Sequence, residues 1–75
     1  MTGSELRAIR EGLGLSLVGM GRALGYQGTR ETLNSQMHKY ENGARPIPPW
    51  IARLATMYQR HGYPEDWDNL PFILA

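Results

Sequence analysis

The sequence contains no cysteine, so neither a disulfide framework nor a thiolate-bound metal can support the fold. No apolar run approaches the roughly 18 residues of a membrane span, and the first residues lack the basic and apolar segments of a secretory signal. A chain of 75 residues has room for one small domain. We therefore expect a compact cytoplasmic protein that is held together by its apolar residues alone.

Patterns of catalytic and metal-binding residues are also missing. His38 and His61 are far apart and lack the spacing of common zinc sites, and Ser16 has no recognisable His and Asp companions. The glycines in residues 12–14 and 19–21 resemble phosphate-loop fragments, but no strand pattern precedes them and no Gly-Lys-Ser/Thr follows. The sequence predicts no enzyme, no cofactor, no metal and no small-molecule ligand.

Charge is distributed unevenly along the chain, although the net charge is only +1. Residues 1–60 hold all eight basic side chains and four acidic ones, so their net charge is 8 − 4 = +4. Residues 61–75 carry Glu65, Asp66 and Asp68 without a Lys or Arg, which gives −3. A basic body favours a polyanionic partner, although an ordinary solvated surface has the same pattern.

Apolar residues recur at helical spacing in four segments. The first covers residues 4–13, the second follows a Ser16 cap and ends at Gly25, the third covers residues 33–42, and the fourth covers residues 49–61. One more helical turn is predicted from Pro64, before an apolar tail. The predicted apolar faces consist of Leu6, Ile9, Leu13, Leu17, Met20, Ala23, Leu24, Leu33, Met37, Tyr40, Ile51, Leu54, Ala55 and Tyr58.

Two glycines weaken the second helix, because Gly19 and Gly21 each cost about 1 kcal/mol relative to Ala. Close approach of another helix at Gly21 would explain this choice, since a Cβ there would hold the helices apart. Residues 26–32 lack a sustained apolar period, so we expect an extended loop, with or without a helical turn around Arg30 and Glu31. We therefore expect an all-α fold of four to five helices.

The order and spacing of these elements resemble the Cro/C1-type helix-turn-helix family, also called xenobiotic-response-element-like. Residues 6–10 resemble its first helix, residues 13–16 read LGLS like its entry to the second helix, and residues 40–43 read YENG like its closing WENG. The resemblance covers roughly residues 4–58 and implies a lambda-repressor-like DNA-binding domain, which we place at residues 1–62; residues 63–75 are the C-terminal tail. It also implies a bacterial or phage regulator of the kind that mobile genetic elements carry.

Two features depart from the family pattern. Leu17 stands where the family has a glutamine that contacts a phosphate. Gly25 and Tyr40 lie fifteen positions apart, about six more than in the family. The extra residues either extend the loop or lengthen the third helix at its start, and either arrangement offers Gln27, Thr29 or Arg30 to DNA.

The resemblance places DNA reading on the third helix, whose N-terminal part enters the major groove in such proteins. Short amides and hydroxyls suit base edges, and Asn or Gln can bind adenine through two hydrogen bonds. The predicted base contacts are Asn34, Ser35, Gln36, His38 and Lys39. The predicted contacts to the DNA backbone, which position the protein without reading sequence, are Ser16, Arg22, Thr29, Arg30 and Arg45.

The apolar tail predicts a second partner, because a monomer this small has little room to bury it. We expect a two-fold homodimer interface that includes Tyr58, Trp67, Leu70, Phe72 and Ile73. The alternative is that the tail folds back onto its own core. The overall prediction is a repressor that binds a palindromic operator as a homodimer; a protein-interaction module on the same scaffold, such as an antitoxin or antiactivator, is the second hypothesis.

Overall fold

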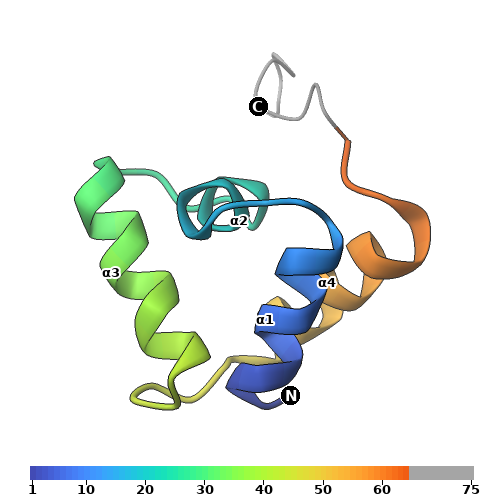
Figure 1. The fold of residues 1–75 in the computed structure, drawn as a ribbon, viewed down its shortest axis with the longest axis horizontal. Helices are drawn as coiled ribbons and strands as arrows, with labels where there is room; N and C mark the ends of the chain where they lie inside the picture. Colours follow the sequence, from blue (N-terminus) through green and yellow to red (C-terminus); the bar gives the residue numbers. More distant parts are fainter. Residues whose placement is uncertain (65–75) are drawn as a thin grey trace.

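The computed structural model describes residues 1–64, which form four helices: α1 (Gly3–Gly12), α2 (Leu17–Ala23), α3 (Arg30–Glu41) and α4 (Pro49–His61). The helix α2 packs mainly against α3, whereas α1 contacts both α3 and α4 (Figure 1). Residues 1–64 contain no strand, so the all-α prediction is confirmed. The helical turn predicted beyond Pro64 lies outside the described residues.

Side-chain caps begin the first two helices, and the cap of the second is at Ser16, as the sequence predicts. The Thr2 hydroxyl accepts a hydrogen bond from the Glu5 amide at 3.1 Å, and the Glu5 carboxylate accepts one from the Thr2 amide at 2.7 Å. The Ser16 hydroxyl accepts from the Gly19 amide at 2.9 Å. Each cap satisfies amides that have no partner inside the helix, so both helices begin at a fixed residue.

A glycine fixes the end of α2. Gly25 has φ of +97°, and its amide donates to the Arg22 carbonyl at 3.0 Å. The Tyr26 amide donates to the Gly21 carbonyl at 3.0 Å. This pair of bonds closes the last turn, and it needs a left-handed residue that only glycine adopts at low cost.

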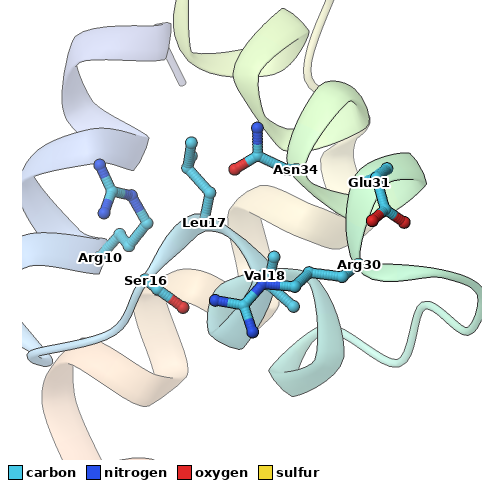
Figure 2. Close-up of a pocket in the computed structure, with 7 residues that line it drawn as sticks. All are labelled: Arg10, Ser16, Leu17, Val18, Arg30, Glu31 and Asn34. Carbon is cyan, nitrogen blue, oxygen red and sulfur yellow. The ribbon is translucent and has the colours of Figure 1, made fainter.

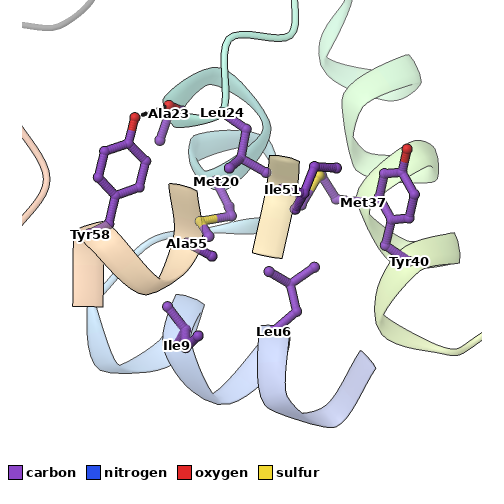
Figure 3. Packing of buried hydrophobic residues seen from close by; sticks show 10 residues of the cluster. All are labelled: Leu6, Ile9, Met20, Ala23, Leu24, Met37, Tyr40, Ile51, Ala55 and Tyr58. Atoms are coloured by element: carbon purple, nitrogen blue, oxygen red, sulfur yellow. Dashed lines mark hydrogen bonds between the residues drawn. The ribbon is translucent and has the colours of Figure 1, made fainter. Parts of the chain in front are cut away.

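All four helices contribute to one apolar core (Figure 3). Among the described residues no charged or polar side chain is fully buried, and no buried side-chain nitrogen or oxygen lacks a hydrogen-bond partner. The core therefore combines low polarity with complete hydrogen bonding, as a small domain without covalent crosslinks requires. Its largest fully buried side chains are Leu6, Met20, Leu33, Met37 and Ile51.

Gly21 allows α2 and α3 to pack closely, as predicted. A Cβ at this position would lie 3.3 Å from Met37 Cγ and 3.6 Å from Leu33 Cβ. Both neighbours are fully buried side chains of α3. The low helix propensity of this glycine is thus offset by the packing that it permits between the two helices.

Two predictions are corrected. The third helix begins at Arg30 rather than Leu33, because Thr29 acts as its N-cap and accepts from the Thr32 amide at 3.2 Å. Of the two arrangements that the sequence leaves open, the structure has the one in which the extra residues lengthen α3 at its start, and the loop ends at Thr29. Tyr58, predicted at a dimer interface, is buried in the core of its own chain, where its hydroxyl donates to the Ala23 carbonyl.

Gly3 lets the first turn of α1 pack against the last turn of α3. A Cβ at Gly3 would lie 2.6 Å from the Glu41 carbonyl carbon and 2.8 Å from the Tyr40 carbonyl oxygen. Because backbone atoms cannot move aside cheaply, we expect Gly3→Ala to lower the free energy of unfolding by about 1 to 3 kcal/mol. Urea denaturation measures this change. The control is Gly12→Ala, whose Cβ meets nothing within 4 Å; an equal loss in both variants would contradict the packing argument.

Candidate nucleic-acid interface

The helix α3 has one buried side and one polar side. Leu33, Met37 and Tyr40 face the core, and no apolar residue interrupts the opposite surface. Of the predicted base-contact residues only Gln36 is half-buried, and the others are exposed. Within residues 1–64 none of these side chains makes a hydrogen bond or an ion pair. Their donors and acceptors are thus available to a ligand.

The polar side chains do not form a single row along α3. Successive helical residues turn by about 100°, so Asn34 and Gln36 lie about 160° apart around the axis. Asn34 lines a hollow beside α2, whereas Gln36 lines a second hollow on the other flank of α3. The two predicted base contacts therefore lie on opposite flanks of α3 and do not share one face. Ser35 lies between them, near the middle of the exposed surface.

The first hollow, named here the α2–α3 hollow, lies between the starts of those two helices (Figure 2). Figure 2 shows the guanidinium of Arg30 reaching back toward Val18 at the start of α2. The structure thus brings together one predicted base contact and two predicted backbone contacts. The lining residues are Arg10, Ser16, Leu17, Val18, Arg30, Glu31 and Asn34.

The second hollow, named here the Arg45 hollow, joins the other flank of α3 to the chain that follows it. The Arg45 guanidinium carbon lies 5.9 Å from the centre of the Tyr40 ring, a cation–π distance. Lys39 lines the same hollow, so two cations lie together on this flank. The lining residues are Glu31, Thr32, Ser35, Gln36, Lys39 and Arg45.

Three other predicted contact residues lie apart from these hollows or have structural roles. His38 lines a smaller depression with Glu41 and Asn42, nearer the end of α3. Thr29 caps α3, and its hydroxyl also donates to the Thr32 hydroxyl at 2.8 Å. Arg22 is exposed in the last turn of α2 and lines neither hollow.

Sequence reasoning missed an ion pair that positions the end of α3. Arg10 Nε lies 2.7 Å from Glu41 Oε2, and Arg10 Nη2 lies 3.2 Å from Glu41 Oε1. Arg10 Nη1 also donates to the Leu15 carbonyl at 3.0 Å. The hydrogen bond with Glu41 raises the pKa of Arg10. The helical spacing of α1 placed Arg10 on the solvated side, and nothing local in the sequence indicates a partner 31 residues away.

Aromatic contacts hold the connection between α2 and α3 in place. The Tyr26 and Tyr40 hydroxyls are 3.0 Å apart and share a hydrogen bond. The Tyr26 ring also packs on Trp50, with ring centres 5.7 Å apart and planes tilted by 52°. Tyr26 thus ties the connection to α3 and to the start of α4.

The surroundings of Tyr26 predict that the folded protein loses stability at alkaline pH. Burial, with a smaller contribution from the hydrogen bond to Tyr40, raises the pKa of Tyr26 to about 12 from its ordinary value near 10. The folded state thus keeps a proton that the unfolded chain releases, so the contribution of Tyr26 to stability is fully present below about pH 10 and is lost as the pH rises from about 10 to 12. Burial raises the pKa of Tyr58 as well, which adds to the same slope.

Urea denaturation across this pH range measures the decline. Tyr26→Phe should reduce the slope by up to one proton per molecule and leave the contribution of Tyr58 in place. An unchanged slope in Tyr26→Phe would contradict the assigned environment.

The predicted dimer interface falls mostly outside the described residues. Trp67, Leu70, Phe72 and Ile73 all lie beyond residue 64. Within residues 1–64 the exposed large apolar side chains are Met1, Trp50 and Met57. Trp50 and Met57 are 46% and 52% exposed and lie seven residues apart, so they share one side of α4 about 10 Å apart along its axis. The residues between them include Ala52, Arg53 and Thr56, which line a shallow apolar hollow with Met57.

The geometry agrees with comparison to known families. Residues 3–66 match the model of a family described as helix-turn-helix domain. Comparisons with curated proteins and with solved structures give no significant match. No helix in residues 1–64 is long and apolar enough to cross a membrane. The match covers most of the chain, and the chain therefore belongs to the helix-turn-helix domain family, which indicates a DNA-binding regulator.

Proposed function

We propose that this protein is a sequence-specific repressor that binds a palindromic operator as a homodimer and reads it with α3. The observation that carries the proposal is the polar side of α3, where the predicted base-contact side chains make no hydrogen bond or ion pair within residues 1–64. A solvated surface helix is commonly stabilised by pairs of charged side chains three or four residues apart. The absence of such pairs on this side leaves the hydrogen-bonding groups free for base edges.

The two flanks of α3 suit different tasks. Asn34 is exposed beside the start of α2, and its amide can bind adenine N6 and N7 together. Lys39 and Arg45 supply positive charge on the other flank, where they suit guanine or phosphate oxygens. Arg30 suits a phosphate near the start of α2. We propose Ser35, Gln36 and His38 as further contacts, and Ser16, Arg22 and Thr29 as backbone contacts.

The test is a binding-site selection from a randomised duplex library, followed by titration of the selected duplex and of random duplexes at several salt concentrations. Asn34→Ala should lose discrimination at one position, whereas Arg45→Ala should weaken all duplexes and reduce the salt slope by about one. The matched control is Arg60→Ala, which removes the same charge from the last turn of α4, away from α3 (Figure 1). Equal losses in all three variants would refute these roles.

A second copy of the chain is the proposed partner of the apolar side of α4. The two large side chains Trp50 and Met57 are about half exposed on this side, and the tail that follows α4 holds Trp67 and Leu70. Burial of such a surface between two copies gives the two-fold symmetry that a palindromic operator matches. The interface thus combines the α4 surface with residues 63–75.

Sedimentation equilibrium tests the homodimer. Met57→Lys should raise the dimer dissociation constant by at least tenfold, since it places a charge in an apolar contact. Gln59→Lys is the control, because Gln59 lies on another side of α4. A wild-type protein that stays monomeric at tens of micromolar would refute the homodimer. The DNA titration would then decide whether the monomer binds DNA in a sequence-specific way.

The second candidate function is a protein-interaction module on the same scaffold. Leu17 and Val18 favour it, because they make the wall of the α2–α3 hollow apolar where a phosphate contact is expected. The DNA titration separates the two functions. Binding that shows neither salt dependence nor sequence preference would support the interaction module and refute the repressor.

A further inference from the structure

Glu31 differs from the other acidic residues in the described part of the chain. Residues 1–64 contain four acidic side chains including Glu31, and neighbours engage the other three. One belongs to the capping box of α1, and each of the two ion pairs contains one: Glu5, Glu11 and Glu41. The Glu31 carboxylate makes no hydrogen bond and has no Lys or Arg within 4.0 Å among residues 1–64. Glu31 is therefore the acidic residue of this part of the protein whose carboxylate has no direct hydrogen-bond or ion-pair partner.

Glu31 lies between the two flanks of the polar side of α3, at the start of the helix. It lies in the first turn of the helix and lines both the α2–α3 hollow and the Arg45 hollow. Figure 2 shows its carboxylate on the outer side of α3, while the neighbouring Arg30 extends the other way, toward α2. The N-terminal part of a recognition helix is the part that enters the major groove.

An unpaired carboxylate here opposes binding to DNA, because it repels the phosphates that the surrounding cations attract. Base edges in the major groove offer one exocyclic amine, cytosine N4, that a carboxylate characteristically binds. We propose that Glu31 is a specificity-determining residue that accepts a hydrogen bond from a cytosine and penalises other bases at that position. This inference rests on the proposed function, and it shifts the start of the reading surface one turn toward the N-terminus of α3.

A structural role for the same carboxylate must be separated from base reading. A negative charge in the first turn also stabilises a helix through the macrodipole. Glu31→Asp keeps that charge but withdraws the carboxylate by one methylene, whereas Glu31→Gln removes the charge at nearly constant shape. If the role is structural, Glu31→Gln lowers the melting temperature and leaves the base preference unchanged.

The experiment compares sites selected from a randomised duplex library by the wild type, Glu31→Gln and Glu31→Asp, with thermal melts of each protein. We expect a cytosine preference of roughly five- to hundredfold at one position in the wild type. Glu31→Gln should lose it or shift it to adenine, while binding random duplexes more tightly than the wild type. Glu31→Asp should melt like the wild type and still weaken that position.

The outcomes distinguish the role of Glu31 from the proposed function, sequence-specific DNA binding, on which it rests. Wild-type protein that selects no sequence refutes both. The wild type can select a sequence while Glu31→Gln selects the same base at every position with the same strength. That result refutes the role of Glu31 and leaves the proposed function intact. A loss confined to one position supports it.

Discussion

Arg10→Met should lower the free energy of unfolding by about 3 to 5 kcal/mol, because it leaves the Glu41 carboxylate without its cationic partner. The side chains of Arg10 and Glu41 are only 14% and 7% exposed, so solvent can replace the lost contacts only in part. Arg10 also bonds the Leu15 carbonyl, so the variant loosens the connection between α1 and α2. A chain of this length is stabilised by about 4 to 11 kcal/mol in total, so the variant should lose a large share of its stability and melt at a clearly lower temperature.

Chemical denaturation followed by circular dichroism measures this loss, and two further variants identify its cause. Arg7→Met removes an arginine from the same helix whose ion pair with Glu11 is exposed, so its effect should stay within about 1 kcal/mol. Replacing both members of this largely buried pair, in Arg10→Met with Glu41→Met, should cost less than Arg10→Met alone, because no unpaired charge remains. A double variant less stable than either single one would contradict this account.

Met37→Ala should lower the free energy of unfolding by about 2 to 5 kcal/mol. Met37 is fully buried, and it lies in the core where α3 faces α2, beside the space that Gly21 leaves open. Truncation removes its buried methylenes and sulfur and leaves a cavity between the two helices of the DNA-binding motif. The neighbouring helices can close that cavity only by shifting relative to each other.

The measurement for Met37→Ala is again urea denaturation. The matched control is Met57→Ala, which truncates the same residue type at a position that is 52% exposed. In dilute solution that control should change stability by no more than about 0.5 kcal/mol. Similar losses at both positions would mean that packing against α2 does not determine the contribution of Met37.

Local patterns in the sequence predict most of the scaffold. The caps at Thr2 and Ser16, the glycine that ends α2 and the prolines that begin α4 all act on neighbouring residues, so sequence spacing indicates them directly. The buried side of α3 follows from the spacing of its apolar residues. Even the close approach at Gly21 is predictable, because a poor helix former in a helix needs a packing reason.

The features that sequence reasoning missed depend on the relative placement of distant segments. The ion pair between Arg10 and Glu41 joins residues that only the packing of α1 on α3 brings together. The contact of Gly3 with the end of α3 has the same origin. The first turn of α3 carries no apolar residue, so periodicity cannot reveal it, although the threonine cap at Thr29 is a local indication.

The same limit applies to the candidate interface. Sequence spacing predicts which residues lie on the polar side of α3, and the structure places most of them at the surface. It cannot predict that Asn34 faces the start of α2 while Gln36 faces Arg45, because the positions of those neighbours are set by the fold. The unpaired state of Glu31 is likewise visible only once all possible partners have been placed.

The connection between α2 and α3 is fixed independently at its two ends. Gly25 stops α2 and Thr29 starts α3, so the orientation of each helix end is set by bonds to its own turn. A change in the number of residues at Gln27 and Gly28 would therefore leave the bonds that end α2 and begin α3 in place. In this protein the length of the connection and the ends of the two helices that it joins are thus determined by different residues.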